Sequence, residues 1–167
     1  MLGPAEEIII HQFAEETKAA IQQAIKSKRV TKYGAVNSSG RLHDSVEIVY
    51  SEHGFKILAN KYIENVIYGI QPGTKVSVSA IKSWIQEKPV PQGKGELSID
   101  SLAYLIAKKI EREGSVMYRQ YKGSNSGLLD EAINEQKINS FADKLGEGVI
   151  NSITSEVLDL FETLQTA

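Results

Sequence analysis

The chain has 167 residues, a formal net charge of −2 at pH 7 and no cysteine. This length fits a single domain that can bury a core without cross-links, and the missing cysteine excludes disulfides, thiolate zinc sites and a cysteine nucleophile. The longest apolar run near the start, residues 8–10, is too short for a signal segment or a membrane span. We therefore expect a soluble protein that makes no membrane contact.

Charge is distributed unevenly along the chain. Residues 128–167 hold eight acids and two lysines, a net charge of −6, which leaves +4 for the residues before them. Such asymmetry can accompany an interaction surface, but an acidic, solvated helix face is the simpler interpretation.

The first half predicts a helix followed by a hairpin. Apolar residues recur every three or four positions over residues 5–27, which predicts an amphipathic N-terminal helix. Basic, serine-rich residues 28–39 have no such period and predict a loop. Residues 44–60 contain two alternating runs joined at Gly54, which predict an antiparallel hairpin core.

Residues 61–165 predict a helical remainder. A short helix over 61–68 precedes Gln71-Pro72-Gly73, which fits a type II turn. Ser77 and Ser98 predict the starts of helices ending by residues 88 and 113, separated by a loop at 89–97. Further expectations are a strand within 115–126, a short helix at 128–133 and a long C-terminal helix that breaks or bends at Gly146 and Gly148.

These elements predict an α+β fold in one domain, residues 1–167. A small antiparallel β-hairpin sheet would pack against several amphipathic α-helices, with long helices at the N- and C-terminal ends.

The sequence offers little that resembles an active site. The three histidines lie too far apart for a metal motif, and no phosphate-binding glycine loop occurs. His43, Asp44 and Ser45 are consecutive, whereas a nucleophile, base and acid must converge, so their spacing argues against a triad. We expect no enzyme activity, no catalytic, cofactor-binding or metal-ligating residues and no cofactor.

Two segments suggest contact with nucleic acid. The basic stretch 26–32 could bind phosphate, and the aromatic and basic segment 118–122 could stack on the bases of a single strand. A surface loop and an edge strand are the simpler interpretations of the same segments.

Several short patterns in order resemble one known family. They are Gly40-Arg41-Leu42-x-Asp44-Ser45, the hairpin, Tyr62-x-x-x-Val66-x-x-Gly69, the stretch around Trp84, residues 102–114 and Gly127-Leu128-Leu129. Together they look like the neck, head-to-tail connector or tail-completion proteins of tailed bacteriophages, over residues 5–160. Departures from the family pattern are Ser39 for threonine, Ile67-Tyr68-Gly69 for an acid-aromatic-glycine step and Gly127-Leu128 for a proline-aromatic pair.

The resemblance implies a non-enzymatic virion structural protein in the phage neck or tail, assembled in the host cytoplasm. It implies a homo-oligomeric ring of six- or twelvefold symmetry that joins the portal or adaptor to tail proteins, with DNA passing through the lumen. On this reading the candidate subunit-interface residues are Arg41, Tyr62, Tyr68, Gln71, Pro72 and Gly73.

Overall fold

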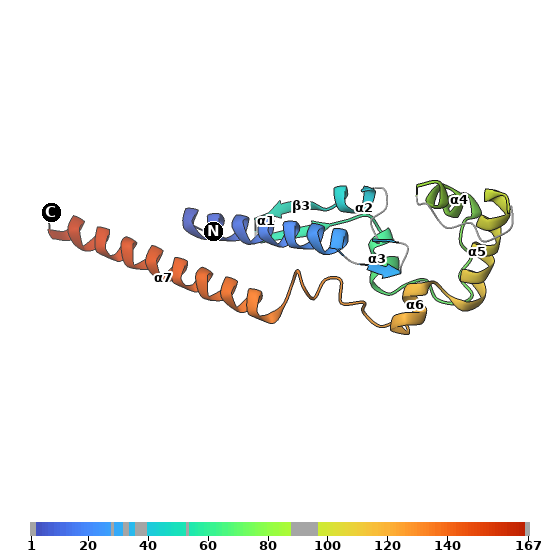
Figure 1. Ribbon diagram of the computed structural model, residues 1–167. Coiled ribbons are helices and arrows are strands. Elements are labelled where there is room, and N and C mark those ends of the chain that lie inside the picture. The colour runs from blue at the N-terminus through green and yellow to red at the C-terminus, as the bar shows by residue number, and fades with distance from the viewer. Residues whose placement is uncertain are drawn as a thin grey trace.

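A computed structural model describes residues 3–27, 29–31, 34–35, 40–52, 54–87 and 97–165. In chain order, its elements are α1 (Pro4–Ser27), β1 (Arg29–Thr31), β2 (Gly34–Ala35), α2 (Arg41–Asp44), β3 (Glu47–Ser51), β4 (Gly54–Leu58), α3 (Tyr62–Ile67), α4 (Val78–Glu87), α5 (Ile99–Glu113), α6 (Val116–Tyr121) and α7 (Glu135–Gln165). The molecule is elongated, with the end of α7 at one extreme and the α4–α5 pair at the other (Figure 1). The expected α+β class is confirmed.

The main core forms around the second half of α1. Three- and four-residue spacing places Ile10, Ala14, Ile21 and Ile25 on one buried face of this helix. The C-terminal end of that buried face packs against residues of α2, α3 and the segment after Gly127. The core cluster comprises Ile21, Ala24, Ile25, Leu42, Val46, Val66, Ile67, Leu128 and Ala132.

The hairpin lies beside α1. Strands β3 and β4 pair antiparallel, with Ile48 opposite Ile57 and Tyr50 opposite Phe55. Aromatic rings of the hairpin pack against rings of α1. His11 of α1 stacks on Tyr50 of β3 with ring centroids 3.9 Å apart, and Phe13 of α1 meets Phe55 of β4 edge-on. A two-stranded sheet is marginal by itself, so this packing is what stabilises it.

Helix α7 runs along α1 and then past its N-terminal end (Figure 1). Phe141 stacks on Phe13 at 4.1 Å between ring centroids. Farther along, the Ser152 hydroxyl donates a 2.8 Å hydrogen bond to Oε1 of Glu6, whose side chain is buried. Hydrogen bonds from its own backbone N–H and from Ser152 hold the pKa of Glu6 below its usual value.

The α4–α5 pair is capped as expected from the sequence. The Ser77 hydroxyl accepts a hydrogen bond from the backbone N–H of Ala80, and that of Ser98 accepts one from Ser101. Buried Ile85, Ala103 and Ala107 lie within this pair. Helix α4 ends at Glu87, in agreement with the expected end by residue 88, and α5 ends at Glu113 as expected.

The expected strand within residues 115–126 is wrong, because residues 116–121 form helix α6. Ser115 caps this helix by accepting a hydrogen bond from the N–H of Tyr118. Alternation over so few residues cannot distinguish a strand from a single helical turn with one buried side chain, here Met117.

Three further expectations need correction. Residues 128–133 form hydrogen-bonded turns rather than a helix, with the N–H groups of Ala132 and Ile133 both bonded to the carbonyl of Leu129. Helix α7 is unbroken across Gly146 and Gly148. The expected loop at 28–39 contains the paired strands β1 and β2. Helix α2, which no sequence pattern predicted, precedes the hairpin.

Most of the expected loop at 89–97 lies outside the described residues. In the part of the chain that the structure describes, no helix has both the length and the apolar character needed to cross a bilayer.

Candidate interaction surface

The segment between α3 and α4 is fixed against the corner where α5 gives way to α6. The N–H of Ile70 donates to the Ser115 hydroxyl at 2.9 Å, and the N–H of Ser115 donates to the Ile70 carbonyl at 2.8 Å. The N–H of Gly73 donates to the carbonyl of Glu111 at 2.7 Å. These bonds hold an otherwise exposed segment in one conformation.

The turn at Gln71-Pro72-Gly73 forms as expected. The N–H of Thr74 donates to the Gln71 carbonyl at 3.3 Å, and Gly73 has φ of +86°, the value that a type II turn requires at this position. All three turn residues are exposed. Tyr68, at the end of α3, is 51% exposed, so these interface candidates present polar and aromatic groups on a rigid support.

The other two candidates lie apart from that turn. Tyr62 begins α3 and is 49% exposed. Arg41 begins α2, and its guanidinium donates a 2.8 Å hydrogen bond to Glu87 at the end of α4. The Arg41 contact joins α2 to the α4–α5 pair, so this residue has a role within the chain as well as an exposed side chain.

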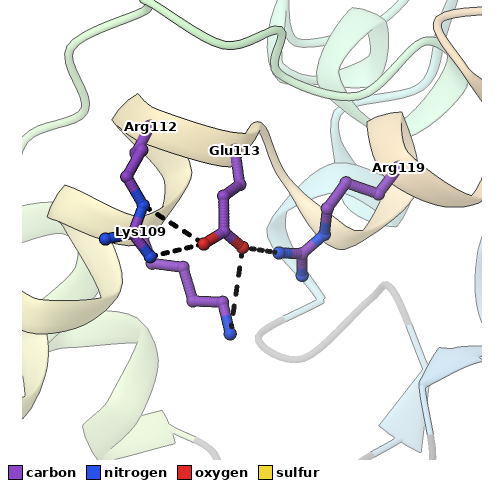
Figure 2. A network of polar contacts seen from close by, with 4 residues as sticks. All are labelled: Lys109, Arg112, Glu113 and Arg119. Atoms are coloured by element: carbon purple, nitrogen blue, oxygen red, sulfur yellow. Dashed lines mark hydrogen bonds and ion pairs between the residues drawn. The ribbon is translucent and has the colours of Figure 1, made fainter.

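A cluster of three cations around one carboxylate lies at the α5–α6 corner (Figure 2). Glu113 contacts Arg112 at 2.5 Å, Arg119 at 2.7 Å and Lys109 at 4.0 Å. We call Lys109, Arg112, Glu113 and Arg119 the cationic cluster. Its net charge is +2, and the cationic side chains are 59%, 76% and 37% exposed, in the order Lys109, Arg112, Arg119.

The neighbouring ion pair adds no charge to the cationic cluster. Lys108 and Glu111, which are adjacent along α5 to Lys109 and Arg112, pair with each other at 2.8 Å. The cationic cluster therefore presents two positive charges that no acid within it neutralises, and a partner with negative charge fits this surface.

Glu113 gives the cationic cluster a pH dependence. The hydrogen bond from Arg112, and then the charges of Arg112, Lys109 and Arg119, lower the pKa of Glu113 from its usual 4.5. A lowered pKa in the folded state stabilises the fold above pH 4.5, and this contribution is lost as the pH falls through the folded-state value.

We therefore expect Glu113→Gln to be less stable than the unmodified chain above pH 4.5, with the difference closing at more acidic pH. Urea unfolding of both chains, from about pH 6 to about pH 3, measures this difference. Comparing the two chains cancels the titration of the other carboxyl groups. A difference that stays constant across this range would contradict the assigned ion pairs.

The two segments considered for nucleic-acid contact are brought together. Strand β1, Arg29–Thr31, lies beside α6, which carries Arg119. The Tyr118 ring is packed near Gly114 and Gly123, and a methyl group on those glycines would come within 2.8 Å and 3.1 Å of it. Tyr118 is thus half-buried with its ring packed against the chain, and it is poorly placed to stack on a base. Lys28 and Lys32 lie outside the described residues.

Sequence reasoning missed the contribution of α5 to this surface. The spacing of Lys109 and Glu113 is that of an i,i+4 ion pair and was available from the sequence. The contact of Arg119 with Glu113 could not be predicted from the sequence, because it depends on the chain turning at Gly114 and on residues 116–121 being helical.

The side chains of the consecutive His43, Asp44 and Ser45 do not converge as a triad. Nδ1 of His43 lies 2.7 Å from Oδ1 of Asp44. The Ser45 hydroxyl donates to the carbonyl of Leu42 and accepts from the N–H of Asn60, so it is engaged with the backbone. Among the described residues no group of three or more potential ligands is arranged to hold a metal ion.

The geometry therefore favours a surface for binding a macromolecule, made by the rigid turn at Gln71–Gly73 and the cationic cluster. Comparison of the chain with protein-family models, curated proteins and solved structures gives no match.

Proposed function

We propose that the chain is a non-enzymatic structural subunit of a ring that joins the head of a tailed bacteriophage to its tail. The ring would contact the portal or adaptor on one side and tail proteins on the other, and would belong to the neck or tail of the virion. Two kinds of support are independent: the ordered sequence patterns and the amount of surface that the chain leaves exposed.

The exposed surface carries the proposal. The chain has a mass of 18.4 kDa and an accessible surface of 11538 Å², whereas a compact monomer of that mass exposes about 8,200 Å². The excess is larger than the roughly 800 Å² per partner that a standard specific interface buries. Exposed apolar side chains lie at both ends of the elongated molecule, including Tyr104 and Leu105 on α5 and Ile150 and Ile153 on α7. A subunit with neighbours on two sides accounts for this distribution.

The sequence pattern that ends at Gly69 has a physical reason. Gly69 has φ of +76°, and a side chain there would overlap the backbone of Tyr118. This glycine lets the end of α3 approach α6, which sets the position of the exposed turn that follows. The pattern therefore marks a structural constraint at the proposed contact surface.

The mass of the purified chain in solution tests the proposal. Light scattering on a sizing column, over a range of concentrations and with and without portal or adaptor proteins, is expected to show a discrete ring or a complex with those partners. A chain that neither assembles into a ring nor binds a virion partner under any salt condition would contradict the proposal.

A second candidate function is nucleic-acid binding by an accessory protein. The observation that favours it is the contact of β1, Arg29–Thr31, with α6, the helix that carries Arg119. This function requires an affinity for DNA or RNA that falls steeply as salt is raised. Absence of binding at low salt would remove it, whereas weak binding fits both candidates because DNA passes through a neck.

A further inference from the structure

Helix α7 continues well beyond its last identified contact with α1. Gly148 lies against Ile9, where a methyl group would come within 2.9 Å of Cδ1, and Ser152 bonds to Glu6. After Ser152 the helix runs on to Gln165, a further length of about 20 Å. Figure 1 shows this part of α7 projecting past the N-terminal end of α1.

An apolar stripe runs from Ile150 into the projecting part of α7. Ile150, Ile153 and Val157 are 64%, 56% and 43% exposed, and their spacing of three and four residues continues in the sequence to Leu160 and Leu164. A narrow stripe with this period is typical of a seam that fits another helix. A solvated helix of this length gains little stability by itself, so the stripe points to a helical partner.

The charge of this part of α7 restricts the choice of partner. No lysine, arginine or histidine follows Lys144, while four acids do: Glu147, Glu156, Asp159 and Glu162. Pairing two copies of this stretch would bring negative charges together, which opposes association. A helix that combines apolar and positive residues is the complementary surface.

The outer face of α5 has both properties. Leu105, Lys109 and Arg112 are spaced by four and three residues and so share one face. Leu105 is 51% exposed beside Tyr104 at 53%, and Lys109 and Arg112 belong to the cationic cluster with its net charge of +2. Apolar residues at one end of this face and cations at the other match the stripe of α7 and its flanking acid Glu156.

We infer that the C-terminal part of α7 of one copy docks on the α5 face of the next copy, with Ile153 and Val157 against Leu105 and Glu156 near Arg112. The two surfaces lie at opposite ends of the molecule (Figure 1), so the contact joins separate copies. Such a head-to-tail contact is heterologous and generates a closed ring or an open filament. This inference names the subunit contact of the proposed ring and rests on that function.

Reversing one charge on each surface tests the contact. Arg112→Glu and Glu156→Lys are each expected to weaken self-association of the full-length chain about tenfold, a loss of about 1.4 kcal/mol. A 1:1 mixture of the two variants should restore association, because each tail then meets a face of opposite charge. Raising the salt concentration should weaken association of the unmodified chain. Light scattering or sedimentation over a concentration series measures all four results.

Lys56→Glu is the matched control, since it makes the same charge change at an exposed position on β4. It is expected to leave association unchanged. Circular dichroism of each variant separates loss of contact from loss of fold.

Other outcomes overturn the inference. This contact is excluded if self-association is unchanged in Arg112→Glu, or if mixing the two charge variants fails to restore association. Association that strengthens with salt and is lost only in Ile153→Asp indicates α7 pairing with α7. Loss of DNA binding in Arg112→Glu without a change of mass assigns the cationic cluster to nucleic acid.

The same measurements keep this contact separate from the proposed function. A chain that remains monomeric at every concentration overturns the contact, and its binding to portal or adaptor proteins then decides the connector function independently. A ring that forms in all charge variants supports the connector function and excludes this contact.

Discussion

Gly69→Ala is expected to destabilise the protein by roughly 2–5 kcal/mol. A positive φ costs a residue with a Cβ about 1–2 kcal/mol, and forcing extra atoms into a packed region typically costs about 1–3 kcal/mol more. At Gly69 φ is +76°, and the added methyl group would overlap the backbone N and Cα of Tyr118, which cannot rotate away as a side chain would. Urea unfolding measures the change in free energy.

Gly73→Ala separates these two causes. Gly73 has a similar φ of +86°, but outside Gly73 and its two chain neighbours no atom lies within 4 Å of the position that a methyl group would take. The Gly73→Ala variant should therefore lose only the free energy that the positive φ costs, about 1–2 kcal/mol. Equal losses for the two variants would mean that the close approach of α3 to α6 contributes nothing.

Leu128→Ala is expected to destabilise the protein by about 2–5 kcal/mol, the range for deleting a buried leucine side chain. Leu128 is 1% exposed and belongs to the cluster formed by α1, α2 and α3. Its segment has no regular helix or strand to hold it, because residues 128–133 form turns. We expect thermal or urea unfolding to show the full loss, since the cavity would lie in the centre of the core.

Leu158→Ala provides the matched comparison, because it removes the same atoms from a side chain that is 58% exposed. Its effect should stay within about 0.5 kcal/mol. If the two leucine variants unfold alike, residues 128–133 do not pack against α1 as described.

The parts of the fold that follow from local physics could be predicted. The stripe of α1, the alternation in β3 and β4, and the caps at Ser77 and Ser98 each follow from a short stretch of sequence. The turn at Gln71–Gly73 could also be predicted from the sequence, since proline fixes its own φ and glycine tolerates the positive φ that the turn requires.

The parts that depend on distant neighbours could not be predicted. Helix α6 forms where Ser115 both caps it and accepts a hydrogen bond from Ile70, 45 positions earlier in the chain. The cost of Gly148 within α7 is offset by the close approach to Ile9 that a glycine allows. The candidate site was only partly predictable, because Arg119 reaches Glu113, and so joins Lys109 and Arg112, only when α5 turns into α6 at Gly114.

The position of the main core makes the two ends of the molecule unequal. Among the described residues, the core cluster draws on α1, α2, Val46, α3 and residues 128–132, and on nothing from α4 or α5. The α4–α5 pair is attached through the Arg41–Glu87 ion pair and the backbone bonds at Ile70 and Gly73. It can therefore open while the core stays folded, and its backbone amides should exchange with deuterium faster than those around Ile25. Equal protection would show one cooperative unit, whereas faster exchange would show that the α4–α5 end is the less stable part of the chain.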